Sequence, residues 1–376
     1  MSKITIILGP FLSSPPFHAG AVEKVWWSLA SKLRGLGHSV TVIRKGSGRN
    51  FVDSEEVIEV TGFNRPRNIF FAIILDLIYS FRAVRAAPAS DIIIVNTFWG
   101  CRVFSLLQRL SVLSAQSKVV VNLQRMPKLG SLIVLPKGQK VFAVSEALKD
   151  NISKSIFGST FDVKVIGNPI ATDEFYSTEF DRQCRPRRVA FAGRIHPEKG
   201  VDYLIESFVA SGISERGWEL YLFGPISTEA GGGGDEYFAK LEKLSEGQSV
   251  KFRGEIKNPS ELARELRQCE IFVYPSLAEN GETFGVAPLE AMACGCATIV
   301  SDLSCFSGFA QDRANCLRFD HRANGIENLT RKLFQLADNE GLRRTLTQNA
   351  VHAAQEFNEL AIAKQYSAAV SEIVNE

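Results

Sequence analysis

The sequence lacks the segments that would place it in a membrane or in an oxidising compartment. Its most apolar stretch, residues 69–81, is thirteen residues long and too short to span a bilayer. Residues 4–8 are too short for the apolar core of a signal peptide. The 7 cysteines are odd in number, scattered and without C-x-x-C spacing, which predicts neither a disulfide framework nor a zinc site. We therefore expect a cytoplasmic globular protein.

The composition is that of a packed protein whose charge is unevenly distributed. A chain of 376 residues predicts two or three domains, and 45% hydrophobic with 22% charged residues argues against disorder and coiled coil. The net charge of +2 divides into +11 for residues 1–168 and −9 for the remainder. This asymmetry favours two domains with different partners, the basic one meeting anionic lipid, nucleic acid or a phosphorylated acceptor.

Short apolar runs alternate with amphipathic stretches, and this series occurs twice along the chain. Strands alternating with helices predict the α/β class, here as two doubly wound, Rossmann-like domains facing each other across a cleft. We predict an N-terminal domain over residues 1–168, a linker over 169–186, a C-terminal domain over 187–355 and a terminal helix over 356–376 that returns to the first domain. The predicted strands are residues 4–8, 39–43, 91–95, 118–123, 140–144 and 163–166, followed by 188–192, 219–223, 250–252, 271–274 and 297–300.

The first cluster with chemical content is residues 191–200, which read Phe-Ala-Gly-Arg-Ile-His-Pro-Glu-Lys-Gly. It follows a predicted strand directly, and Gly193 permits a sharp turn off the strand end. Arg194 and Lys199 can converge on one anion across the loop. The arginine guanidinium offers a planar set of hydrogen-bond donors and the lysine ammonium a mobile point charge. Together they suit a diphosphate.

The second cluster, residues 275–293, also follows a strand. Gly281 and Gly285 indicate a loop whose backbone amides could approach phosphate oxygens at a helix amino terminus. Glu282 lies on that loop and Glu290 in the helix after it, and a carboxylate is a natural acceptor for two vicinal sugar hydroxyls. By contrast, four consecutive glycines at residues 231–234 predict only a flexible surface loop, because ordering them costs much entropy.

Together these clusters resemble the signature of retaining family 4 glycosyltransferases with the GT-B fold, and within it members of polysaccharide biosynthesis. The Gly-Arg-x4-Lys-Gly loop is followed by Glu282-x7-Glu290, and four earlier motifs match in the family's order. These are the glycine loop at residues 19–23, Gly-His-Ser-Val at 37–40, and the pair Ala-Val-Ser-Glu at 143–146 with Val-Ile-Gly-Asn-Pro at 165–169.

The resemblance implies a hexosyltransferase that uses a nucleotide-diphosphate sugar, with UDP-glucose favoured, and a glycan or lipid-linked saccharide as acceptor. It implies front-face displacement without a divalent metal or another cofactor, and the chain contains no Asp-x-Asp motif. The implied catalytic residues are Arg194, Lys199 and Glu282. The implied donor-binding residues are Gly20, Gly224, Ile256, Thr283, Phe284, Gly285, Val286 and Glu290.

The sequence departs from the family pattern at its amino-terminal contacts. Asn96 and Gln124 stand at two positions where the family often has histidine, and Ala19 stands where a second glycine is usual. His18, beside the glycine loop, is a candidate substitute for the missing histidine. The residue that replaces the usual histidine therefore stays open.

Two other function classes compete with this interpretation. A nucleotide-sugar epimerase of the same fold would bind UDP but transfer nothing, and a non-enzymatic module could bind nucleic acid through the basic half. That half lacks aromatic residues interleaved with Lys and Arg in an RNA-binding pattern, so no nucleic-acid partner is expected. Residues 69–81, flanked by Arg65, Arg67, Arg82 and Arg85, predict instead a core helix or peripheral contact with the inner face of an anionic membrane.

Overall fold

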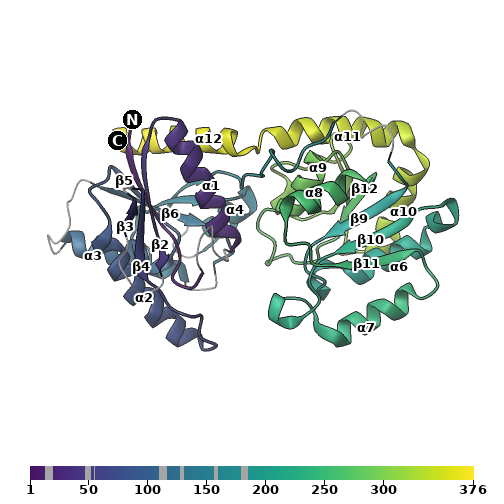
Figure 1. The fold of residues 1–376 in the computed structure, drawn as a ribbon, viewed down its shortest axis with the longest axis horizontal. Helices are drawn as coiled ribbons and strands as arrows, with labels where there is room; N and C mark the ends of the chain where they lie inside the picture. The colour runs from purple at the N-terminus through teal and green to yellow at the C-terminus, as the bar shows by residue number, and fades with distance from the viewer. Residues whose placement is uncertain are drawn as a thin grey trace. The chain divides into compact units, whose positions relative to one another are not determined.

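The computed structural model describes residues 1–12, 20–46, 52–54, 56–109, 117–127, 131–155, 160–178 and 185–376. Its contacts divide the chain into two units (Figure 1). Unit 1 comprises Met1–Pro169 with Glu359–Glu376, and unit 2 comprises Ile170–Asn358. Each unit holds a largely parallel sheet with helices, which confirms the predicted α/β class of two doubly wound domains.

The sheet of unit 1 has the order β3-β4-β2-β1-β5-β6-β7-β8, and among its pairs only β3 and β4 are antiparallel. Helices α1 and α12 pack together, as do α2 and α3. The strands are β1 (Lys3–Ile7), β2 (Ser39–Gly46), β3 (Val52–Ser54), β4 (Val57–Thr61), β5 (Ile92–Val95), β6 (Lys118–Leu123), β7 (Lys140–Ala143) and β8 (Asp162–Val165). The helices are α1 (Ala21–Gly35), α2 (Ile69–Ala86), α3 (Phe98–Arg109), α4 (Glu146–Ser153), α12 (Glu359–Asn375) and the 3-10 turn η1 (Ser131–Val134).

Unit 2 has an all-parallel sheet in the order β11-β10-β9-β12-β13-β14. Helices α6, α7 and α10 form one group and α8, α9 and α11 another, and Figure 1 shows α7 and α8 on opposite sides. The strands are β9 (Arg188–Ala192), β10 (Glu219–Phe223), β11 (Val250–Gly254), β12 (Ile271–Tyr274), β13 (Ala297–Ser301) and β14 (Leu317–Phe319). The helices are α6 (Val201–Ala210), α7 (Gly234–Ser245), α8 (Pro259–Arg267), α9 (Val286–Ala293), α10 (Gly325–Asp338) and α11 (Glu340–Gln355), with 3-10 turns η3 (Pro197–Lys199), η4 (Ile213–Arg216), η5 (Thr228–Ala230) and η6 (Ser304–Phe306).

The central strands form because both faces of a parallel sheet are covered, which favours continuous apolar runs. All four residues of β5 and of β12 are buried, and both appear in the sequence as uninterrupted apolar segments. The strands that sequence analysis missed are β3, β4 and β14. β3 and β14 lie at sheet edges and have three residues each, too few for a recognisable pattern. β4 lies next to an edge and is only partly buried.

The chain passes between the units at residues 169–170 and again at 358–359. Residues 170–178, predicted as linker, lie within unit 2, where Ile170 and Phe175 are buried. The Ile170 backbone N–H donates to the carbonyl oxygen of Phe357 at 2.9 Å, so the two passages are tied together inside unit 2. After the second passage α12 packs on α1, where the ring centroids of Trp26 and Tyr366 are 5.0 Å apart.

Candidate active site

The predicted donor residues of unit 2 gather at the carboxyl edge of its sheet. Strands β10 and β11 lie on one side of β9, whereas β13 and β14 lie beyond β12. The loops after β9 and β12 therefore leave the sheet in opposite directions, and ligands of doubly wound folds bind at such a switch point. The Arg194–Lys199 cluster follows β9, and the Glu282–Glu290 cluster follows β12.

Close backbone contacts hold the loop after β9. A Cβ atom on Gly224 would lie 1.7 Å from the Gly193 carbonyl oxygen, so the ends of β9 and β10 meet only because Gly224 has no side chain. Gly200 has φ of +63°, and a Cβ there would lie 2.2 Å from the Pro275 carbonyl oxygen. Leu277 N–H donates to the Glu198 carbonyl at 2.8 Å, which joins the loop after β9 to the loop after β12.

Lys199 and Glu282 form an ion pair where these two loops meet. Lys199 Nζ lies 2.7 Å from Glu282 Oε2, and only 9% and 12% of their side chains are exposed. The Tyr274 hydroxyl also hydrogen-bonds Glu282, and burial together with this carboxylate raises the pKa of Tyr274 well above its usual value. The lysine ammonium lies 5.5 Å from the centroid of the Tyr274 ring. The structure thus brings two of the three predicted catalytic residues into direct contact.

Arg194, the third predicted catalytic residue, is held at a more exposed position on the same loop. Its Nη1 donates to the Gly231 carbonyl at 2.8 Å, and its Nη2 pairs with Glu198. The glycine run is therefore not the free loop that its composition predicts. Gly233 N–H donates to Ile195 O at 2.8 Å and Gly234 N–H to Ile226 O at 2.9 Å, which orders the run against the arginine loop. Spatial proximity, which sequence spacing does not reveal, gives these glycines a role.

Helix α9 begins at the predicted donor loop. Its N-cap, Gly285, has φ of +94°, and a Cβ there would lie 2.5 Å from the Phe306 ring, so no other residue fits without displacement. Thr283 and Val286 flank the buried Phe284 and are half-buried. Glu290 lies on α9, and burial raises its pKa to about 8. A ligand that offers hydroxyl groups to this carboxylate would supply the solvation that it lacks.

Two further predicted donor-binding residues, Gly224 and Ile256, lie at the far side of the same edge. Gly224 N–H donates to the Gly254 carbonyl at 2.8 Å, which joins the ends of β10 and β11. Ile256, two residues after β11, is half-buried. The strand ends of β11, β10, β9 and β12 thus present Ile256, Gly224, Arg194 and the Glu282 loop in spatial order.

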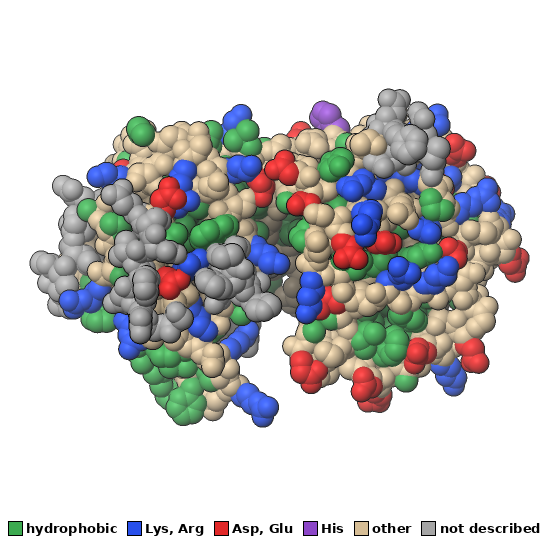
Figure 2. Space-filling view, in the orientation of Figure 1, with side chains coloured by type: hydrophobic (Ala, Val, Ile, Leu, Met, Phe, Trp, Pro, Cys, Tyr) green, Lys and Arg blue, Asp and Glu red, His purple; other side chains and the backbone are tan. Residues whose placement is uncertain are grey.

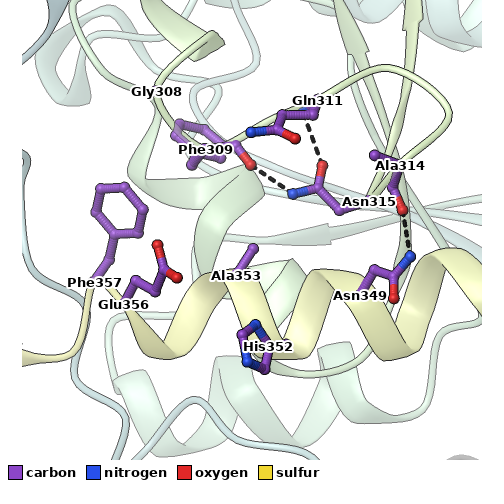
Figure 3. Close-up of a pocket in the computed structure, with 10 residues that line it drawn as sticks. All are labelled: Gly308, Phe309, Gln311, Ala314, Asn315, Asn349, His352, Ala353, Glu356 and Phe357. Atoms are coloured by element: carbon purple, nitrogen blue, oxygen red, sulfur yellow. Dashed lines mark hydrogen bonds between the residues drawn. The ribbon is translucent and has the colours of Figure 1, made fainter.

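A cavity of about 300 Å³ lies behind the donor loop in unit 2, between residues 308–315 and α11 (Figure 3). Its wall includes Phe309 and Phe357, whose ring centroids lie 5.5 and 5.7 Å from that of Phe284. Asn349 and Asn315 donate to backbone carbonyls across it. Phe284 therefore anchors the donor loop on an aromatic cluster rather than pointing into open solvent.

Unit 1 contains the remaining predicted contact, Gly20, which is the N-cap of α1. A Cβ on Gly20 would lie 2.4 Å from Glu23 Oε2, and Glu23 is 6% exposed. Burial raises the pKa of Glu23, and the Arg125 guanidinium opposes this shift. Sequence analysis named Glu23 only as part of a motif, although a carboxylate at the first turn of a helix after β1 is a recognisable signal.

The other strand ends of unit 1 carry amides. Asn122 Nδ2 donates to Asn96 Oδ1 at 2.8 Å, and Asn96 Nδ2 donates to the Ile7 carbonyl at 3.1 Å. Asn96, which we predicted to stand where the family often has histidine, thus belongs to an amide network. His18 and Ala19 lie outside the described residues. Burial also raises the pKa of Asp76, on α2, to about 7, and sequence analysis did not select this residue.

In the described ranges no group of three or more His, Cys, Asp or Glu side chains could hold a metal ion. Nor does any described helix have the length and apolar character needed to cross a membrane. Cys184 lies outside the described residues, and the other six cysteines are free and buried.

Similarity to known proteins defines the class of this molecule. The structure of sucrose-phosphate synthase from Thermosynechococcus elongatus matches it with a TM-score of 0.76 at 19% identity and covers 99% of both chains. Anabaena HepE, solved in complex with UDP and glucose, matches with a TM-score of 0.71 at 16% identity over 99% of this chain and 100% of that one. Two doubly wound units with these neighbours define the GT-B fold, as predicted.

Sequence similarity to a known family lies in unit 2. Residues 174–352 match the family model of glycosyl transferases group 1. N,N'-diacetylbacillosaminyl-diphospho-undecaprenol alpha-1,3-N-acetylgalactosaminyltransferase of Campylobacter jejuni is 36% identical over 140 residues, which cover 36% of this chain and 34% of that protein. The matched stretches span between 19% and 55% of the lengths of three such curated relatives. Residues 174–352 thus resemble group 1 glycosyltransferases, and the chain has the GT-B fold, as the sequence analysis predicted.

Proposed function

We propose that this protein transfers a hexose from a UDP-sugar, with UDP-glucose favoured, to a glycan or lipid-linked saccharide with retention of configuration. The observation that carries the proposal is the Lys199–Glu282 pair at the switch point between β9 and β12. One site there offers a cation for a diphosphate and a carboxylate for sugar hydroxyls. The Campylobacter relative, whose name describes an acceptor joined to undecaprenol through a diphosphate, supports a lipid-linked acceptor.

In the proposed reaction the bond between the sugar C1 and the β-phosphate oxygen breaks while the acceptor oxygen bonds to C1 on the same face. The acceptor proton passes to the departing phosphate oxygen, so the products are UDP and the glycoside. Lys199 and Arg194 stabilise the negative charge that grows on the diphosphate. Glu282 accepts hydrogen bonds from the donor hexose, and Glu290 accepts them from the nucleotide ribose.

The predicted site has two cations at the diphosphate position, and we propose that they replace a divalent metal. Activity should then persist in EDTA. A loss of more than about tenfold on adding EDTA, restored by manganese, would contradict metal independence without affecting the assignment as a transferase.

Incubation with UDP-glucose, UDP-galactose and their N-acetylated counterparts, with GDP-mannose as a control, tests the proposal through UDP release. The configuration of the newly formed linkage, measured by NMR, tests retention. Lys199→Ala is the control against a contaminating enzyme. UDP release should fall in this variant, whereas a contaminant would release UDP equally in both preparations. Interconversion of the sugar nucleotides without UDP release would identify an epimerase instead.

A further inference from the structure

Helix α2 exposes apolar side chains along its outer face. Phe70 and Phe71 are 64% and 57% exposed, and Ile69 is 62% exposed. A surface helix ordinarily turns a polar face to water, and a helix that is apolar on all sides is normally covered. Figure 2 shows hydrophobic side chains along the projecting helix labelled α2 in Figure 1. The outer face also includes Ile78 and Phe81, which are 39% and 43% exposed.

The core of unit 1 does not require these residues. Helix α2 packs on α3 and β4, and its buried residues are Tyr79, Ser80, Ala83 and Val84. Asp76 lies on the same inward side by helical spacing, one turn before Ser80. The opposite side of the helix carries the exposed Phe70, Phe71, Ile78 and Phe81. These side chains form a second apolar face, which we call the outer face of α2.

Arginines border the outer face at both ends. Arg65 and Arg67 precede the helix, Arg82 and Arg85 lie in its last turns, and all four are exposed. The guanidinium carbon of Arg82 is 5.6 Å from the Phe63 ring centroid, and that of Arg85 is 5.7 Å from the Phe81 ring centroid. The aromatic rings thus keep the cationic groups beside the outer face, in the arrangement of side chains at a boundary between water and hydrocarbon.

The positive charge around α2 favours an anionic partner. Between residues 62 and 90 the only acidic residue is the inward Asp76. In a symmetrical dimer through the outer face, the same four arginines of two copies would approach each other. An anionic bilayer instead offers phosphates to the arginines and acyl chains to the phenylalanines.

We infer that α2 lies in the plane of an anionic membrane, with its outer face in the acyl region and its bordering arginines at the lipid phosphates. This deepens the proposed function, on which it rests for a lipid-linked acceptor. The inner side of α2 contacts the carboxyl edge of the unit 1 sheet, where Ser80 Oγ and Thr97 Oγ1 are 3.2 Å apart and Thr97 follows Asn96. An acceptor with a lipid anchor would reach this edge from the bilayer that holds α2.

Sedimentation with vesicles tests the inference in the full-length protein. Vesicles of phosphatidylcholine with one quarter phosphatidylglycerol should bind the wild type, and pure phosphatidylcholine should bind it at least about tenfold less. Phe70→Ser with Phe71→Ser should weaken binding to anionic vesicles by at least about tenfold, because two large side chains no longer enter the acyl region. Phe334→Ser is the matched control, because Phe334 is 40% exposed on α10 in unit 2 and also lies beside an arginine, Arg216.

The arginines are tested separately from the phenylalanines. Arg65→Gln with Arg67→Gln should reduce binding to anionic vesicles by about tenfold in low salt, whereas Arg313→Gln with Arg344→Gln, at exposed positions in unit 2, should not. Raising the salt to 0.5 M (about 4 Å Debye length) should remove this difference. The effect of the phenylalanine substitutions should remain.

The inference is overturned if anionic vesicles never sediment the wild type, or if the phenylalanine variant binds them as the wild type does. A dimer in solution that the same variant dissociates would identify a second copy as the partner and also overturn it. UDP affinity and donor hydrolysis without vesicles should be equal in wild type and variants. If the wild type lacks both, the proposed function fails, and the vesicle result still decides the role of α2.

Discussion

The carboxyl edges of the two sheets have the same reversal of strand order but carry different side chains. In each unit the strand order reverses beside the first strand, between β1 and β5 in unit 1 and between β9 and β12 in unit 2. The unit 2 edge carries two cations, Lys199 and Arg194, each paired with a carboxylate. The corresponding edge of unit 1 carries the amide network of Asn96 and the buried Glu23.

The difference follows from what each edge would bind. A diphosphate is the same anion in every nucleotide-sugar donor, so its site needs fixed cations, and such cations produce a sequence signature. Acceptor hydroxyls can be bound by many combinations of amides and carboxylates, and no one spacing is required. The proposed donor edge can therefore be predicted from a single sequence, whereas the residues of the unit 1 edge are identified only from the fold.

Removing a cation from the donor edge should have the largest effect. Lys199→Ala should lose about 10²–10³ in rate, because charge builds on the diphosphate as the glycosidic bond breaks, and should also weaken UDP binding. Arg194→Lys should only partly rescue Arg194→Ala, because the planar fork is lost. The two sites share one diphosphate, so their effects should be less than additive. Turnover and calorimetric UDP affinity measure both effects. Lys251→Ala, which removes an exposed lysine paired with Glu219, is the matched control. If Lys199→Ala binds UDP as tightly as the wild type does, Lys199 does not belong to the donor site.

The two carboxylates of the donor edge should differ in the step that they affect. Glu282→Ala should lower kcat by about tenfold to a hundredfold, because Glu282 is expected to act at the reacting sugar. Glu290→Ala should mainly raise KM, by about tenfold, because a remote ribose contact contributes equally to ground and transition states. Steady-state kinetics with varied donor separates them. Full activity in Glu282→Ala would exclude it from the reacting centre.

A substitution at the unit 1 edge should leave UDP affinity unchanged. Glu23→Gln should lower transfer to a saccharide acceptor by about tenfold and leave UDP affinity unchanged, because Glu23 belongs to unit 1 whereas the proposed diphosphate ligands Arg194 and Lys199 belong to unit 2. Glu146→Gln, at an exposed glutamate in the first turn of α4, is the control. A parallel loss of UDP affinity in Glu23→Gln would show that the two edges do not divide donor and acceptor in this way.

The smallest effect expected concerns stability and pH. Burial raises the pKa of Glu290 to about 8, so between its unfolded value near 4.5 and this pKa the folded protein binds the extra proton. The contribution of Glu290 to stability therefore falls as pH rises through this window. Glu290→Gln should raise the melting temperature by a few degrees more at pH 8 than at pH 5. Equal shifts at both pH values, measured by calorimetry without ligand, would contradict this account of Glu290.

The sequence predicted those parts of the fold and site that depend on local pattern. Runs such as residues 271–274 mark buried strands, and the glycines next to Arg194 and Glu282 mark the loops that follow them. What it missed depends on contacts between distant segments. The carbonyl of Gly231 that holds Arg194, and the carboxyl of Glu23 against Gly20, acquire their roles only when the chain is folded. The outer face of α2 is an intermediate case, because the apolar run is visible in sequence but its exposure is not.

The Lys199–Glu282 pair also bears on which molecules the proposed donor site rejects. Lys199 and Glu282 neutralise each other at 2.7 Å. A bound donor would therefore have to supply an anion for the lysine and hydrogen-bond donors for the carboxylate. Inorganic phosphate would satisfy the lysine and leave the largely buried carboxylate with the Tyr274 hydroxyl but no cation. A free sugar would satisfy the carboxylate and leave the lysine without an anion. Only a molecule that joins an anion to a hydroxylated ring offers both replacements. In the proposed donor site this ion pair would therefore disfavour inorganic phosphate alone and a free sugar alone.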